Sequence, residues 1–302
     1  MPAAQRQGKP SRSTRSLAPQ GLMQAPALAP TAAKAPSQSG QPQRRILGEG
    51  LHKSFLLHGR PIVAVGNVSF HVVEHEFVAL IGPSGCGKST VLNMVAGLTK
   101  PSSGRLWIDG DPVAGPSPKV GYIFQKDTTL PWKTVEQNIA LGLDYRGVAP
   151  EERRRRVADM IRMAKLEGFE HAYPAMLSGG MRQRVALMRS FIVEPEVLLM
   201  DEPFGALDTH TALMLHQELL GLWQRNRQAI LFVTHNLSEA ITLADRIILL
   251  GARPSQVKAE VTVEIPRPRD VIAVRETPAY HRIYQQLWHA LGAEFQHATS
   301  SP

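Results

Sequence analysis

Apolar residues along this chain gather in short, continuous runs, a pattern typical of parallel strands that are buried on both faces. Such runs occupy residues 77–81, 197–200 and 230–234. Residues 151–167 differ, because Val157, Met160, Ile161 and Ala164 recur there at helical spacing. Short apolar strands interspersed with helical segments predict an α/β fold with a mostly parallel sheet flanked by helices.

The two ends of the chain have different patterns. Tyr280, Ile283, Leu287 and Leu291 predict an amphipathic helix in a C-terminal extension, residues 271–302, that packs against the main domain. No apolar run approaches the roughly 18 to 20 residues that a membrane-spanning helix needs. The sequence therefore predicts that this chain does not cross a bilayer.

The formal net charge of +8 comes mostly from the N-terminal region. Residues 1–45 hold seven of the 34 Lys and Arg and none of the 26 Asp and Glu, which leaves 27 against 26 in the remainder. This region is rich in Pro, Ala, Gln and Ser, so we predict a disordered basic tail. A targeting peptide or an arm attracted to anionic lipid is the alternative. The remainder is nearly neutral, and its charge does not indicate a nucleic-acid-binding domain.

Residues 82–90 read Gly-Pro-Ser-Gly-Cys-Gly-Lys-Ser-Thr, directly after one apolar run and before a helical segment. Glycines at these spacings let backbone N–H groups point at phosphate oxygens, and the helix N-terminus adds its positive dipole end. A structural hairpin is the alternative, but the full pattern between strand and helix favours a nucleotide. The predicted nucleotide-binding residues here are Gly82, Pro83, Ser84, Gly85, Cys86, Gly87, Lys88, Ser89 and Thr90, with Lys88 on the outer phosphates and Ser89 also on Mg²⁺.

Cys86 is the only cysteine of the chain, which rules out an internal disulfide and fits a reducing compartment. One interpretation of its place in the phosphate loop is a redox switch. We favour the other interpretation, that this loop position is variable and tolerates cysteine as a small residue.

Two further apolar runs end in polar residues. The run at 197–200 leads into Asp201 and Glu202, and the run at 230–234 leads into His235. Parallel sheets bind ligands at the carboxyl ends of their strands. We therefore expect Asp201 to hold Mg²⁺, Glu202 to polarise the attacking water, and His235, on a strand beside that of Asp201, to contact the γ-phosphate. A helix-capping role for the two acids is the alternative.

Residues 177–184, Leu-Ser-Gly-Gly-Met-Arg-Gln-Arg, open another helix with a serine and two glycines that suit an anion. Together with the phosphate loop and the Asp-Glu strand, this LSGG signature makes residues 46–270 resemble the ATP-binding subunits of ABC transporters. The resemblance implies a P-loop NTPase core with an antiparallel β subdomain and an inserted α-helical subdomain at about residues 127–185.

The family resemblance assigns roles to further residues. Gln125 matches the Q-loop glutamine, which touches Mg²⁺ and senses the membrane partner, and Asp208 matches the D-loop. Phe55 falls where relatives carry an adenine-stacking aromatic; a buried strand residue is the alternative. Asn236 and Ser190 depart from the usual motifs at positions that do not touch phosphate.

One set of motifs occurs in the chain, and in this family ATP lies between the phosphate loop of one subunit and the signature of another. The resemblance therefore implies a second ATP-binding subunit, expected to be an identical copy. Ser178, Gly179 and Gly180 would then bind the γ-phosphate that the partner's Lys88 holds.

Residues 130–139 and 251–255 resemble the nitrate, sulfonate and taurine branch of ABC importers. That resemblance implies an ATPase that uses ATP and Mg²⁺ and drives import of a small anionic solute. Its expected partners are an integral membrane permease, whose coupling helix docks on the helical subdomain, and a periplasmic solute-binding protein. The expected location is the cytoplasmic face of the bacterial inner membrane, as a peripheral protein.

Other functions fit the sequence less well. A soluble ABC-type ATPase that acts on nucleic acid or the ribosome is the main alternative, but such relatives carry two fused cassettes or long coiled coils, and we expect no nucleic-acid partner. The LSGG motif argues against a P-loop kinase or GTPase, and Glu202 with His235 argues against a cassette that does not hydrolyse ATP.

Residues 153–156, four arginines, resemble a nucleic-acid or lipid patch, but a solvated helix start is the commoner meaning of such a run. Trp132 is one of the residues that resemble the importer branch, and packing in the core of the helical subdomain is the alternative interpretation of this residue.

Overall fold

The computed structural model describes residues 43–126 and 128–299. Most of the predicted tail, residues 1–45, lies outside this part of the chain. Strand β1 (Arg44–Leu57) begins two residues before the predicted domain boundary at residue 46. Arg45 makes ion pairs there with Glu74, Asp109 and Glu196, at 2.5 to 2.8 Å. The last two residues assigned to the tail therefore belong to the sheet.

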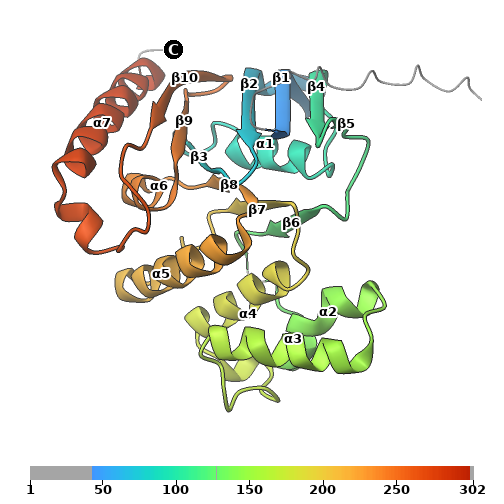
Figure 1. The fold of residues 1–302 in the computed structure, drawn as a ribbon. Helices are drawn as coiled ribbons and strands as arrows, with labels where there is room; N and C mark the ends of the chain where they lie inside the picture. Colours follow the sequence, from blue (N-terminus) through green and yellow to red (C-terminus); the bar gives the residue numbers. More distant parts are fainter. Residues whose placement is uncertain (1–42, 127, 300–302) are drawn as a thin grey trace, which may run out of the picture. The chain divides into compact units, whose positions relative to one another are not determined.

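The described strands form one sheet in the order β5-β4-β1-β2-β10-β9-β3-β8-β7-β6 (Figure 1). One part is antiparallel and matches the predicted β subdomain: β1, β2 (Arg60–Val73), β4 (Ser103–Ile108) and β5 (Asp111–Pro112). The other part is parallel and consists of β3 (Phe77–Ile81), β6 (Val120–Ile123), β7 (Val197–Asp201), β8 (Ala229–Val233) and β9 (Arg246–Leu250). Strand β10 (Ser255–Thr262) joins the two parts, antiparallel to β9 and briefly parallel to β2. Strand β8 lies between β3 and β7, which confirms that the His235 and Asp201 strands are neighbours.

The central strands are apolar throughout because both of their faces are covered. Phe77, Ala79 and Ile81 of β3 face one core with the helices α2 to α7, while Val78 and Leu80 face a second core with α1 and the antiparallel strands. All five side chains are at most 1% exposed. Two-sided burial explains why these strands lack the alternating pattern of a half-exposed sheet.

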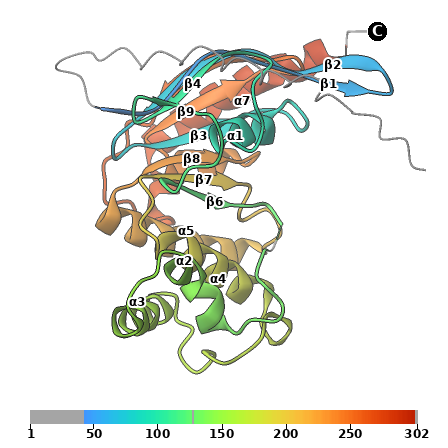
Figure 2. The same cartoon turned by 90° about the vertical axis from the view of Figure 1, so that its right-hand side faces the viewer.

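Helices surround the parallel part of the sheet (Figures 1 and 2). Helix α1 lies on one side, and α5 and α6 belong to the opposite core. The described helices are α1 (Lys88–Val95), α2 (Val135–Tyr145), α3 (Pro150–Met163), α4 (Gly179–Phe191), α5 (Thr209–Asn226), α6 (Leu237–Leu243) and α7 (Pro278–Thr299), with short 3-10 turns η1 (Pro174–Met176) and η2 (Ala273–Glu276). None of the helices in the described residues has the length and apolar character needed to cross a membrane.

The inserted helical segment contains α2, α3 and α4, drawn in green and yellow in the lower half of Figure 1. Thr134 and Gln137 form a capping box that starts α2. The buried Asn138 side chain bonds to both backbone groups of Leu130 and to the carbonyl of Lys133, which fixes the loop before the helix. Helix α4 continues to residue 191, beyond residue 185, the approximate predicted boundary of the helical subdomain.

The C-terminal extension packs as the sequence predicts. Tyr280, Ile283 and Leu287 of α7 are buried, and α7 and η2 contact α6. Arg269, just before the extension, is 4% exposed and donates to backbone carbonyls of α6 and of residues 263–265. Residues 263–287 therefore hold α6, the helix that follows His235, in place.

Candidate functional site

The phosphate loop connects β3 to α1, as the sequence predicts. Gly82 has a φ of +157°, and a Cβ there would lie 2.6 Å from the carbonyl oxygen of Leu250. Gly87, the N-cap of α1, has a φ of +109°, and a Cβ there would lie 2.7 Å from the carbonyl oxygen of Ala64. Only glycine fits these two positions, because both the backbone angle and the close neighbouring backbone exclude a side chain.

Lys88 lies folded along the loop. Its Nζ donates to the carbonyl oxygens of Gly82 at 2.9 Å and Pro83 at 3.0 Å, and the residue is 5% exposed. A buried ammonium requires such partners, since an unpaired buried charge is costly. The Lys88 ammonium group therefore lies against the phosphate loop, where it can pair with an anion that the loop binds.

The carboxyl end of β7 meets the start of α1. Ser89 Oγ donates to Asp201 Oδ1 at 3.0 Å, which brings together two side chains that are 112 residues apart in sequence. Burial raises the pKa of Asp201, while the hydrogen bond from Ser89 acts in the opposite direction. A hydroxyl and a single carboxylate are hard oxygen donors, and this set suits Mg²⁺, which usually takes one or two carboxylates and completes its shell with phosphate and water. Ser89 and Asp201 therefore fit the Mg²⁺ ion that the sequence predicts. The described residues contain no cluster of three or more His, Cys, Asp or Glu that could hold a metal without such a substrate.

Two residues predicted from separate motifs converge on one carboxylate oxygen of a third, Glu202. Glu202 Oε2 lies 3.0 Å from His235 Nδ1 and accepts a hydrogen bond from Gln125 Nε2 at 3.3 Å. The backbone of Glu202 has a φ of +43°, and its N–H donates to the carbonyl of Val233 at 2.9 Å. The turn thus directs Glu202 away from Asp201, its neighbour in sequence. This arrangement can orient a water molecule and accept its proton.

A polar cavity behind these residues is a feature that the sequence analysis missed. It has a volume of about 200 Å³ and is lined by Glu202, His235, His216, Glu239 and Arg275, among others. Glu239 accepts a hydrogen bond from Thr234 Oγ1 at 2.6 Å.

His216 is 2% exposed, and neither of its ring nitrogens has a hydrogen-bond partner within the described residues. Glu239 Oε1 is 3.8 Å from Nε2, too far for a hydrogen bond. Burial lowers the pKa of His216 to about 4, and the charge of Arg275 acts in the same direction. The imidazole is therefore neutral at physiological pH.

The signature residues lie at the N-terminus of α4. Ser178 is its N-cap and accepts a hydrogen bond from the N–H of Met181 at 3.2 Å. Asp208 caps α5 in the same way, by accepting from the N–H of Thr211 at 3.0 Å. A Cβ at Gly180 would lie 2.6 Å from Thr211 Cγ2, so the two helix starts are adjacent. Helix α4 packs against α2, α5 and β6, whereas α1 packs against β2, β7 and β8. The structure therefore does not bring this signature onto the phosphate loop of its own chain.

The adenine-stacking candidate is exposed. Phe55 lies on β1 opposite Ile62 and is 45% exposed, with Lys53 Nζ 5.1 Å from its ring centroid. The alternative, a buried strand residue, is wrong, because this end of the β1-β2 hairpin extends beyond the neighbouring strands. The ring face is available for stacking.

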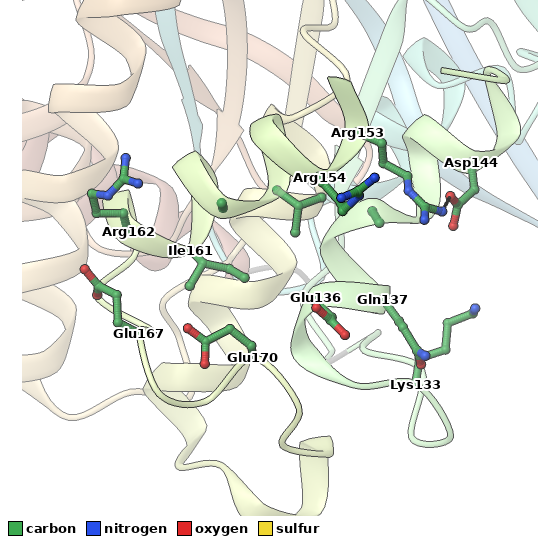
Figure 3. Close-up of a pocket in the computed structure, with 13 residues that line it drawn as sticks. Lys133, Glu136, Gln137, Asp144, Arg153, Arg154, Ile161, Arg162, Glu167 and Glu170 are labelled. Atoms are coloured by element: carbon green, nitrogen blue, oxygen red, sulfur yellow. Dashed lines mark hydrogen bonds and ion pairs between the residues drawn. The ribbon is translucent and has the colours of Figure 1, made fainter. Parts of the chain in front are cut away.

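The helical segment carries a groove between α2 and α3 with a volume of about 640 Å³ (Figure 3). Its floor includes Ala140, Val157 and Ile161, and charged side chains form its rim: Lys133, Glu136, Asp144, Arg153, Arg154, Arg162, Glu167 and Glu170. Trp132 is 70% exposed, so the alternative that it packs the core of the helical subdomain is wrong.

The arginine run at the start of α3 is paired with acids. Arg153 pairs with Asp144, Arg154 with Glu151, Arg155 with Glu152, and Arg156 with Glu194. A run neutralised in this way is a solvated helix start and not a free cationic patch.

Comparisons with known proteins show the family to which this chain is related. A family model described as ABC transporter matches residues 65–205. The chain is 41% identical to the aliphatic sulfonates import ATP-binding protein SsuB of Bacillus cereus, over 73% of this chain and 87% of that protein. It is 39% identical to the taurine import ATP-binding protein TauB of Rhizobium johnstonii, over 76% and 89%. It is 43% identical to the nitrate import ATP-binding protein NrtD of Synechocystis, over 72% and 81%.

The fold also matches a solved structure. It superimposes with a TM-score of 0.66 and 32% identity on a dimeric, post-hydrolysis form of the ATP-binding cassette MJ0796 bound to ADP and Pi. The match covers 73% of this chain and all of that one.

Proposed function

This chain belongs to the ABC transporter family as an ATP-binding subunit with ATPase activity, and from that premise we propose that it drives import of a small anionic solute through a separate membrane permease. The observation that carries the proposal is the convergence of Gln125, His235 and Glu202 beside the Ser89–Asp201 pair. Three motifs spread over the chain thus meet at one carboxylate, and in our proposal the γ-phosphate that Lys88 binds lies beside it.

In the proposed reaction each residue has one task. The phosphate loop and Lys88 bind the β- and γ-phosphates, and Phe55 stacks on adenine. Ser89, Asp201 and Gln125 would hold Mg²⁺, which would supply positive charge to the phosphate oxygens. Glu202 orients the attacking water and accepts its proton, while His235 holds Glu202 Oε2 and contacts the γ-phosphate.

A second copy of this chain completes the site in our proposal. Ser178, Gly179 and Gly180 present a helix N-terminus and a hydroxyl, which suit a γ-phosphate, yet α4 and α1 lie in separate layers of one chain (Figures 1 and 2). Asp208 lies beside them at the start of α5. The relative MJ0796 is dimeric with ADP and Pi bound, which supports this arrangement.

The groove between α2 and α3 is the proposed docking site for the permease. Its apolar floor and mixed charged rim suit a short amphipathic helix. A permease that receives solute from a periplasmic solute-binding protein would place this chain at the cytoplasmic face of the bacterial inner membrane. The solute class, comprising nitrate, sulfonates and taurine-like compounds, is proposed from the similarity to the SsuB, TauB and NrtD proteins.

The dimer proposal is tested with Glu202→Gln. This change removes the proton acceptor and leaves the fold intact, so ATP should accumulate between two chains. Size-exclusion chromatography with light scattering should show a dimer with ATP and Mg²⁺ and a monomer without them. Glu264→Gln, at an exposed position, should hydrolyse ATP as the wild type does. A Glu202→Gln chain that stays monomeric at saturating ATP would contradict the proposed site.

The solute class needs a separate test in cells. Uptake of labelled nitrate, taurine and an alkanesulfonate should be measured in a strain that lacks this chain. Loss of one uptake activity, restored by the wild type and not by Lys88→Ala, supports the proposal. Unchanged uptake of all three would show that the solute class is wrong, and the ATPase assignment would stand.

A further inference from the structure

The segment between β9 and β10 lies against the phosphate loop. Arg253 Nη2 donates a hydrogen bond to the carbonyl oxygen of Gly85 at 2.9 Å, across 168 positions in sequence. The sequence analysis assigned residues 251–255 to a branch of the family and gave them no role at the nucleotide. Their position beside the phosphate loop indicates a role at the nucleotide site.

The ends of this segment fit closely beneath the loop. The carbonyl oxygen of Leu250 would be only 2.6 Å from a Cβ of Gly82, and Ser255 Oγ would be 3.3 Å from a Cβ of Gly87. Ser255 is fully buried, and its hydroxyl donates to the carbonyl of Ala64 on β2 at 3.2 Å. The first and last glycines of the loop are therefore fixed by packing.

The middle of the loop is held differently. Gly85 has a φ of +73°, and a Cβ there would meet no atom of the described residues within 4 Å. Neighbouring backbone therefore does not restrain Gly85 itself. The peptide between Gly85 and Cys86 is held by two hydrogen bonds: its N–H donates to the carbonyl of Pro83 at 3.3 Å, and its carbonyl accepts from Arg253. The N–H and the carbonyl of one trans peptide point in opposite directions, so a loop peptide whose N–H faces a phosphate has its carbonyl on the outer side. A donor that holds the Gly85 carbonyl on the outer side therefore favours the conformation that binds phosphate.

We propose that Arg253 is a positioning residue for the phosphate loop and that it strengthens ATP binding by holding the Gly85 peptide in its phosphate-binding orientation. This inference rests on the nucleotide site proposed above and deepens it. Arg253 acts through the loop and does not touch the reacting atoms. Its loss should therefore raise the KM for ATP and change kcat little.

Cys86, the next residue, provides a native probe of the loop. It is the only cysteine in the sequence, and it is 2% exposed. Burial raises the pKa of its thiol, while the charges of Lys88 and Arg253 act in the opposite direction. Removal of the Arg253 charge without a change in the loop would make the thiolate rarer and slow alkylation. A loosened loop would expose the thiol and accelerate alkylation.

The experiment compares the wild type with Arg253→Ala and Arg253→Lys in the full chain. Arg282→Ala is the matched control, because it removes an arginine from an exposed position on α7. The measurements are the ATP dissociation constant by titration calorimetry, KM and kcat for ATP, and the rate of N-ethylmaleimide modification of Cys86 by mass spectrometry, with and without ATP. Circular dichroism checks that each variant is folded.

For Arg253→Ala we expect ATP binding weaker by about three- to tenfold, the range for one charge-assisted hydrogen bond at an exposed position, with kcat within about twofold and faster Cys86 modification. Arg253→Lys should restore most of the affinity if it folds, and Arg282→Ala should match the wild type. Unchanged ATP affinity in folded Arg253→Ala, or modification of Cys86 that is unchanged or slower, would overturn the inference. Wild-type Cys86 that ATP fails to protect would instead contradict the nucleotide site itself.

Discussion

The buried imidazole of His216 predicts a specific sensitivity to acid. Its pKa is about 4 in the folded chain, against 6.5 for the exposed group. The pKa is lowered on folding, so between pH 6.5 and pH 4 the unfolded chain binds the proton more readily. Stability contributed by the neutral ring is therefore present above pH 6.5 and is lost as the pH falls toward 4.

The magnitude follows from the two pKa values. At pH 5 the folded state loses about 2 kcal/mol relative to the unfolded state, and at pH 4 about 3 kcal/mol. Burial is the main cause of this penalty, and the charge of Arg275 adds to it. Glu239 Oε1 lies 3.8 Å from Nε2, beyond hydrogen-bond distance, so it offers a protonated ring an ion pair without a hydrogen bond. The ring packs edge-on against Phe204, with centroids 4.5 Å apart, so a leucine of similar volume fits the site.

The assay is urea denaturation at pH 7 and pH 5, followed by the fluorescence of buried Trp223. His216→Leu should match or exceed the wild type at pH 7, because it removes two buried nitrogens that have no partner among the described residues. At pH 5 it should exceed the wild type by about 2 kcal/mol more than at pH 7. His281→Leu, at an exposed position on α7, should keep the wild-type difference between the two pH values. Equal losses of stability in His216→Leu and the wild type would refute the reasoning.

Three further predictions concern the loop, the C-terminal segment and the signature. Gly87→Ala should abolish ATP binding by calorimetry, because φ is +109° and its Cβ would lie 2.7 Å from a backbone oxygen, whereas Gly221→Ala in α5 should raise stability by about 0.5 to 1 kcal/mol. Arg269→Met should lower the free energy of unfolding by about 3 kcal/mol in urea titrations, because buried carbonyls at the end of α6 lose their donor; an unchanged midpoint would contradict this. Ser178→Arg should reduce ATPase activity by about 100-fold while each chain still binds ATP, and undiminished turnover would show that the signature does not complete the site.

The sequence predicted much of the nucleotide site because its residues follow the ends of buried strands. Asp201 and His235 lie at or just after the ends of β7 and β8, while Lys88 and Ser89 open the helix that the phosphate loop joins to β3. Parallel strands bring their carboxyl ends to one edge. The motif order identified the family, and the comparisons confirm it. Local patterns were less informative about exposure: a buried position was the alternative for both Phe55 and Trp132, and both side chains are exposed.

Only the tertiary structure decided which distant segments meet. Arg253 reaches Gly85 because β9 pairs with β3. The local sequence of neither strand predicts that they are neighbours. His216 and Arg275 meet behind Glu202 because α5 and η2 both pack near α6. Local sequence specifies strands, helices and the loops at their ends, since these depend on neighbouring residues. Contacts between elements depend on how all the apolar faces are buried together, and only the folded chain settles that.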